Sequence, residues 1–192
     1  MLKKTCLLFL LLILTPYMSH AGTIDVNIKG VDDGVKTTKQ QHYKEAVLFE
    51  AQYGKEIGRD GQFVAYERGV VIDTSTGLVW ASKDNGEDIN WKDAKRYCEN
   101  YRGGGYTDWR LPTQNELAKL YKPDTKNTNP STGKCKGNYR ISKLFHITCC
   151  CPWASETRGS ETAFFNLGHG IRYWYDPSSS HDSRALPVRG GN

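Results

Sequence analysis

The sequence predicts an α+β domain in which two helices pack on a small, mainly antiparallel twisted sheet. The first observation is the stretch from Trp91 to Tyr121, where two amphipathic segments flank a run of three glycines. The second is a set of short apolar segments on either side of this stretch, each bounded by residues that favour turns. The third is the concentration of cysteines after residue 97, which predicts loops stapled by disulfides.

The two helices are predicted from capping residues and periodicity. Asn90 can cap the first helix, and Gly103–Gly105 can end it, because glycine adopts left-handed dihedrals at little cost. Thr113 and Glu116 have the spacing of a capping box, which begins the second helix. The expected core combines this unit with the tryptophans of the flanking segments: Trp80, Trp91, Trp109, Leu111, Pro112, Leu117 and Trp153.

The short apolar segments predict the strands of one sheet. Gly168–Gly170 is expected to form a hairpin turn between two of them. Pro187 lacks an N–H group, so we expect the last strand to lie at an edge. The predicted strands cover residues 63–66, 70–72, 78–80, 153–155, 163–166, 171–175 and 185–189.

The N-terminal segment has the pattern of a secretory signal peptide. Lys3 and Lys4 precede an apolar run, and Ser19-His20-Ala21 supplies small residues for cleavage. We therefore expect a signal peptide over residues 1–21 and a mature protein that is secreted or periplasmic, in a bacterial envelope. The alternative is an uncleaved membrane anchor, although the apolar run is short for a spanning helix. No membrane span is expected after cleavage.

Residues 22–61 are expected to form a leader and a helix, followed by a domain over residues 62–192. The helical pattern covers residues 37–55, and its apolar stripe is too short for a coiled-coil seam. We expect this stripe to pack on the side of the domain. The alternative is that it pairs with another chain and makes the protein self-associate. The stripe consists of Tyr43, Ala46, Val47 and Ala51.

Five cysteines follow the signal peptide, and an oxidising compartment favours disulfides among them. Because the number is odd, at least one is free or paired between chains. We expect Cys135 to pair with Cys149, which closes a loop of about 14 residues and contributes roughly 3 kcal/mol. Cys98 either reaches the cluster Cys149, Cys150 and Cys151 or stays buried. No metal site is predicted, because consecutive cysteines lack the spacer of a zinc knuckle.

Charge and composition disfavour two further ligand classes. The net charge of +5 is modest and the basic residues are interspersed with acids, so no nucleic-acid partner is expected. The acidic stretch over residues 83–88 lacks the alternating oxygens and terminal glutamate of an EF-hand. We therefore expect a solvated loop there rather than a calcium site.

A series of specific motifs extends along this part of the chain. They include Asp73-Thr74, Thr76-Gly77-Leu78, the segment Asp108-Trp109-Arg110-Leu111-Pro112-Thr113, Glu116-Leu117, Trp153-Ala154-Ser155 and Arg184-Ala185-Leu186-Pro187-Val188-Arg189. Together they resemble the C-terminal domain family of the Legionella collagen-like protein (Lcl), over roughly residues 63–190. A weaker likeness, through a W-x-D-A…C…R-L-P-T pattern, is to the formylglycine-generating enzyme family. Both families are associated with C-type-lectin-like folds, so the resemblance implies that fold.

The chain departs from both families in its cysteines. Many relatives of the Lcl domain have a cysteine where this chain has Leu186, so a bridge from the first helix to the final strand is impossible here. The reactive cysteine pair of the formylglycine-generating enzymes would lie in the C-terminal part, but no cysteine follows Cys151. Three histidines also lack a recognisable nucleophile setting: His146, His169 and His181. We therefore predict a protein without enzymatic activity or a cofactor.

The remaining candidate site is a binding surface around the predicted hairpin. Aromatic faces stack on sugar rings, and arginines pair with sulfate or carboxylate groups. By the two-residue period of a strand, Tyr173 and Tyr175 share one face while Arg172 and Trp174 share the other. We expect the face of Arg172 to hold an anionic sugar; the alternative is that alternate residues are simply core. The candidate residues are Arg158, His169, Arg172, Tyr173, Trp174 and Tyr175.

The predicted function is that of an exported, non-enzymatic binding module for a glycan or another extracytoplasmic polymer. The resemblance to Lcl implies adhesion and a sulfated polysaccharide as ligand. The alternative is a protein-interaction or envelope-assembly module.

Overall fold

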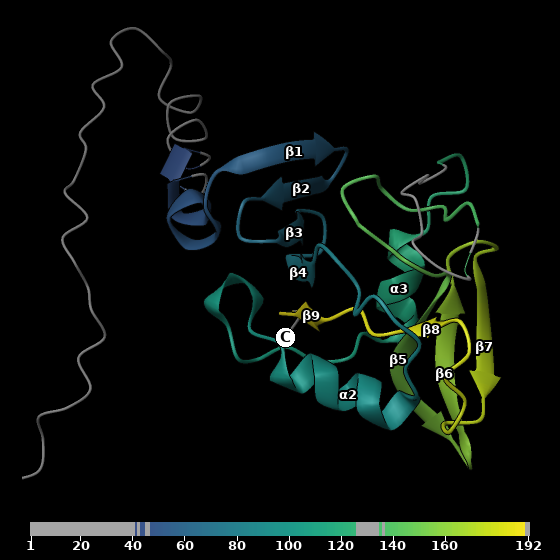
Figure 1. Cartoon of the computed structure of the whole chain (residues 1–192). Coiled ribbons are helices and arrows are strands. Elements are labelled where there is room, and N and C mark those ends of the chain that lie inside the picture. The colour runs from purple at the N-terminus through teal and green to yellow at the C-terminus, as the bar shows by residue number, and fades with distance from the viewer. Residues whose placement is uncertain (1–40, 42, 45–46, 126–134, 136, 191–192) are drawn as a thin grey trace, which may run out of the picture. The chain divides into compact units, whose positions relative to one another are not determined.

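The computed structural model describes residues 41, 43–44, 47–125, 135 and 137–190 (Figure 1). The predicted signal peptide and leader lie outside the described residues. From Tyr43 onward, the described residues belong to one compact unit that contains helices and two mainly antiparallel sheets. The α+β class predicted from the sequence is therefore confirmed. No helix in the described ranges is long and apolar enough to cross a membrane.

The first sheet has the strand order β1-β2-β3-β4-β9, and all neighbouring strands are antiparallel. β2, β3 and β4 match the three strands predicted before the helices. β1 is not predicted by the sequence pattern, because Gly58 interrupts it; as an edge strand it needs a partner on one side only. The predicted domain boundary at residue 62 falls between paired strands. The bounds are β1 (Glu56–Asp60), β2 (Phe63–Tyr66), β3 (Val70–Asp73), β4 (Leu78–Ala81) and β9 (Val188–Arg189).

The second sheet has the strand order β7-β6-β5-β8, with β8 parallel to β5 and the other pairs antiparallel. The expectation of a single sheet is therefore wrong. Of the last predicted strand, only Val188–Arg189 forms a strand, because residues 185–187 lead the chain from the second sheet to the edge of the first, where Pro187 precedes β9. The bounds are β5 (Cys151–Arg158), β6 (Glu161–Asn166), β7 (Ile171–Tyr175) and β8 (Ser183–Arg184).

The predicted helices are α2 (Trp91–Asn100) and α3 (Gln114–Leu120), joined through the short 3₁₀ helix η1 (Gly103–Gly105). The Asn90 side chain accepts a hydrogen bond from the backbone N–H of Asp93 at 3.0 Å. Thr113 and Glu116 form the predicted capping box. Gly104 has φ +64°, a left-handed conformation that glycine adopts without strain. Figure 1 shows α3 beside the strands of the second sheet.

Most of the residues that the sequence predicts as core are buried in the structure. Six of the residues predicted as core are buried: Trp80, Trp109, Leu111, Pro112, Leu117 and Trp153. Trp91 is only half-buried, because it is the first residue of α2 and packs at the edge of the cluster around Trp153. Its indole Nε1 donates to the carbonyl oxygen of Ala154 at 2.8 Å, which fixes the start of α2 on β5.

Residues 47–53 are helical, as predicted, but the helix packs through a different face. Tyr53 is buried, and Phe49 packs against the same cluster of β2, β3 and β4 side chains. Tyr43 and Val47 are exposed, and Leu48 is 66% exposed. The expectation that this stripe packs on the domain is therefore wrong for its described members Tyr43, Val47 and Ala51, because aromatic residues on the opposite face fill that contact. Ala46 lies outside the described residues.

Candidate ligand-binding groove

A row of aromatic side chains crosses the second sheet from its interior to its surface. Trp153 on β5 is paired with Phe164 on β6, which is paired with Tyr173 on β7. The rings of Phe164 and Tyr173 are stacked, with centroids 5.0 Å apart and an interplanar angle of 14°. Trp153 meets Phe164 edge-on at 5.8 Å and is itself fully buried. The buried end of the row therefore holds its exposed end in place.

The exposed end of the row consists of Tyr173 and Tyr175, which are 38% and 53% exposed. Gln114, at the start of α3, donates from its side-chain amide to the carbonyl oxygens of Phe164 and Tyr173, at 2.9 and 3.0 Å. The backbone N–H of Gln114 in turn donates to the carboxylate of Glu156 on β5. The capped helix thus fixes the strands that carry the aromatic rings.

The aromatic row borders a cavity of about 330 Å³. Phe164, Tyr173 and Tyr175 form its apolar side. Cys150, Cys151 and the turn that precedes β8 form the other side, where Ser179 and His181 contribute polar groups. This cavity therefore combines exposed ring faces with hydrogen-bonding groups.

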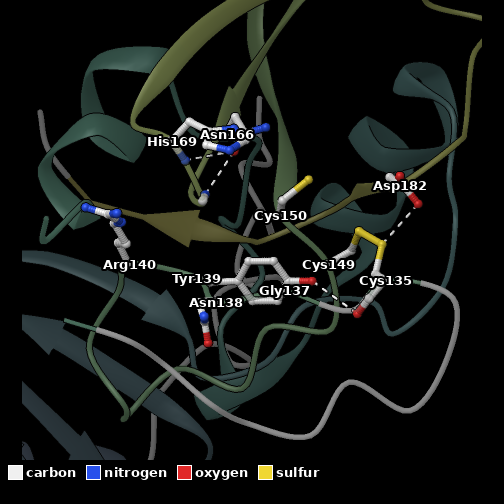
Figure 2. A pocket seen from close by; sticks show the side chains of 11 residues that line it. Cys135, Gly137, Asn138, Tyr139, Arg140, Cys149, Cys150, Asn166, His169 and Asp182 are labelled. Atoms are coloured by element: carbon white, nitrogen blue, oxygen red, sulfur yellow. Dashed lines mark hydrogen bonds between the residues drawn. A yellow bond between two sulfur atoms is a disulfide. The ribbon is translucent and has the colours of Figure 1, made fainter.

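A second, larger cavity of about 550 Å³ lies next to the first, and the two share Cys150, Asn166 and Asp182 as lining residues. Its walls combine polar and apolar groups in equal measure. They come from residues 137–140, from the turn after β6 and from the cysteine cluster (Figure 2). We call the two adjoining cavities together the groove.

Hydrogen bonds position the polar groups of the larger cavity. The side-chain oxygen of Asn166 accepts from the backbone N–H groups of Gly168 and His169, at 2.9 and 3.1 Å (Figure 2). Arg140 donates to the carbonyl oxygen of Pro123 at 2.8 Å, which holds its guanidinium at the wall. Arg140 and His169 line this cavity. Among the described lining residues, only Asp182 carries a carboxylate.

Two disulfides shape the groove. Cys135 is bonded to Cys149, the pair expected from the sequence, and Cys150 is bonded to its neighbour Cys151. The second bridge is not anticipated from the sequence. Cys98 is free and buried, and burial raises the pKa of its thiol far above the ordinary value. Of the two alternatives for Cys98, the structure therefore shows the buried one.

The candidate residues divide between the two faces of the β6–β7 hairpin. Tyr173, Tyr175 and His169 line the groove. Arg172 and Trp174 lie on the other face, as the two-residue period predicts, and Trp174 packs against the main core. Arg158 stacks over the Trp174 ring at 4.5 Å and pairs with Glu161 at 2.8 Å. Arg158, Arg172 and Trp174 are therefore not part of the groove.

Several groove residues are absent from the sequence-based set: Asn138, Arg140, Phe164, Asn166 and Asp182. Asn166 had a local signal, because an asparagine before Gly168 often binds its own backbone in a turn. Arg140 had none, since it lies in a polar stretch whose path over the sheet depends on long-range contacts.

A comparison with protein families identifies the family of this chain. Residues 69–189 match the family model described as the Lcl C-terminal domain. No curated protein matches the chain. The matched region covers well over half of the chain and contains α2, α3, both disulfides and the whole groove. The chain therefore belongs to the Lcl C-terminal domain family.

Proposed function

We propose that this protein is a non-enzymatic binding module whose groove takes a glycan or another extracytoplasmic polymer, in the manner of an adhesin. The observation that carries the proposal is the pair of exposed tyrosines beside polar cavity walls. Tyr173 is held by its stack on Phe164, so a sugar ring would meet a preformed aromatic face. Preformed contact surfaces lose little conformational entropy on binding.

The size and lining of the groove support a polymer as ligand. Cavities of about 330 and 550 Å³ adjoin each other, so a ligand of several units can occupy both. The aromatic side suits a ring face, and Arg140 with His169 suits hydroxyl or acidic substituents. The scaffold supports a C-type-lectin-like fold, since two sheets and two helices present the groove on loops and a hairpin.

Tyr173→Ala is expected to weaken binding to the preferred polysaccharide at least about tenfold, which corresponds to about 1.4 kcal/mol. The reason is that alanine removes the exposed ring face and its stack on Phe164. Binding is measured by biolayer interferometry on immobilised dextran, alginate and dextran sulfate, at low and physiological salt. These polymers are neutral, carboxylated and sulfated, so the panel also identifies the charge class, and salt weakens any ionic part.

Two variants serve as controls. Tyr173→Phe retains the ring and should bind like wild type, whereas Arg172→Ala changes the other face of the hairpin and should have little effect. If Arg172→Ala rather than Tyr173→Ala abolishes binding, the site is on the Arg172 face. If the wild type binds none of the polymers at low salt, the protein-interaction alternative moves ahead. The exposed Leu48 and Ile57 then become the first surface to test.

We also propose that the protein is exported to the bacterial envelope or secreted after removal of residues 1–21. The basic start, short apolar run and Ser19-His20-Ala21 support this proposal. Intact-mass and N-terminal peptide spectrometry of protein from the native envelope should give an N-terminus at Gly22. A retained Met1 would instead support the membrane-anchor alternative.

A further inference from the structure

The Cys135–Cys149 disulfide has a carboxylate as an immediate neighbour. The Sγ atom of Cys135 lies 3.0 Å from Oδ1 of Asp182 (Figure 2). A disulfide sulfur carries no hydrogen, so in the oxidised chain this contact gives the carboxylate no proton donor. A thiol could donate to Asp182, and a cation could bridge the sulfur and the oxygen. The surroundings of Asp182 are therefore better suited to the reduced cysteine pair than to the disulfide.

The same three residues meet the spatial requirement of a metal site. One ligand atom from each of Cys135, Cys149 and Asp182 lies within 4.8 Å of the others. All three residues line the cavity of about 550 Å³, which gives an ion a path from solvent. The second oxygen of Asp182 lies 3.2 Å from Nδ1 of His181, a contact that can orient the carboxylate.

We propose that, when Cys135 and Cys149 are reduced, they bind a zinc ion together with Asp182. Two thiolates and one carboxylate are a donor set that zinc accepts in tetrahedral geometry, with water in the fourth position. Thiolates also disfavour magnesium and calcium, which prefer oxygen ligands. The site is an alternative state of the disulfide, so metal and S–S bond exclude each other.

The site changes from the disulfide to the zinc-bound state in two steps, reduction and then metal binding. A dithiol reductant of the thioredoxin class gives two electrons and two protons and becomes a disulfide itself. The S–S bond breaks, and Cys135 and Cys149 become thiols. The zinc ion then forms two Zn–S bonds and one Zn–O bond, and the two thiol protons pass to solvent. This proposal is independent of polymer binding in the groove.

The test uses the full chain, reduced with a phosphine and titrated with Zn²⁺ in a calorimeter. The reduced wild type should bind one zinc ion, and its melting temperature should rise with zinc. Co²⁺ in place of zinc should give a thiolate charge-transfer band. Asp182→Asn should weaken zinc binding at least about tenfold, since the loss of even an outer-shell partner can do so. Asparagine tolerates the φ of 59° at this position, so the fold should persist.

The controls separate this site from the other thiols. The double variant Cys150→Ser/Cys151→Ser and the variant Cys98→Ser should bind zinc like the wild type. The oxidised wild type should show neither the calorimetric signal nor the cobalt band. Unchanged zinc affinity in Asp182→Asn would overturn the proposal, as would equal binding by oxidised protein. Loss of binding in the Cys150/Cys151 variant would assign the ion to the cysteine run instead.

Discussion

Replacing Trp109 with alanine is expected to lower the free energy of unfolding by about 3–5 kcal/mol, as large-to-small changes in a packed core do. Trp109 is 2% exposed and packs in the cluster formed by β2, β3 and β4. Tyr101 meets its ring edge-on at 4.9 Å. Its Nε1 also donates to the carbonyl oxygen of Gly103 at 3.2 Å, and alanine removes this hydrogen bond. Urea denaturation followed by circular dichroism measures the loss.

Two further measurements test the reason for this loss. Trp109→Phe keeps an aromatic ring but removes the N–H donor, so its cost should lie between wild type and alanine. Tyr101→Leu should lose the edge contact with Trp109 and the ring contact with Tyr97, and should cost less than Trp109→Ala. A loss below about 1 kcal/mol in Trp109→Ala is the size of an ordinary surface change and would contradict a core role for this tryptophan.

The sequence predicts the helical unit well because its signals are local. Asn90, Thr113 and Glu116 act within three residues of their partners, so spacing alone identifies them. The strands β2 to β4 are likewise bounded by turns whose residues directly adjoin them in the sequence. The division into two sheets is not local, because it depends on the path of residues 185–187 between them. β1 is missed because its pairing with β2 compensates for Gly58, which on its own disfavours a strand.

The groove is predicted only in part, for a related reason. Alternation along β7 separates Tyr173 from Arg172 correctly, but it does not show which face lies against the core. In the structure Trp174 packs against the main core, while Tyr173 stacks on Phe164 of the neighbouring strand, and both contacts are with residues outside β7. The opposite wall comes from Arg140 and Asp182, which lie far apart in the chain. The Cys135–Cys149 pair is predicted because loop length and compartment favour it, whereas a bridge between adjacent cysteines has no such signal.

The ion pair of Arg110 and Glu116 connects the strongest sequence motif to the C-terminal end of the fold. The Arg110 guanidinium donates to both carboxylate oxygens of Glu116, at 2.8 and 2.7 Å, and to the carbonyl oxygen of Gly190 at 2.9 Å. Glu116 also accepts from the backbone N–H of Thr113. Burial raises the pKa of Glu116, but hydrogen bonds from Arg110 and Thr113 outweigh it, so the pKa lies below its ordinary value.

The lowered pKa of Glu116 determines how the stability that this ion pair contributes depends on pH. A depressed carboxyl pKa contributes stability that is fully present above the unfolded-state pKa, here the ordinary value of 4.5. The contribution is lost as the pH falls through the lower folded-state pKa. Without Arg110, the pKa of Glu116 loses the lowering effect of the guanidinium and lies higher than in the wild type, so the variant tolerates protonation of this group better than the wild type does.

Arg110→Ala is therefore expected to cost about 2–3 kcal/mol at neutral pH, and clearly less near pH 3, since the lost partner leaves a partly buried charge. Arg59→Ala is the matched control, because Arg59 and Glu56 have the same N–O distance of 2.7 Å as Arg110 and Glu116. The Arg59 pair is 56% and 42% exposed, whereas Glu116 is 15% exposed, so removing Arg59 should cost below about 1 kcal/mol.

Urea melts at both pH values measure the two variants. Equal costs at neutral pH would show that burial does not strengthen the Arg110 pair. A cost for Arg110→Ala that stays the same near pH 3 would assign its role to the Gly190 contact rather than to the charge of Glu116.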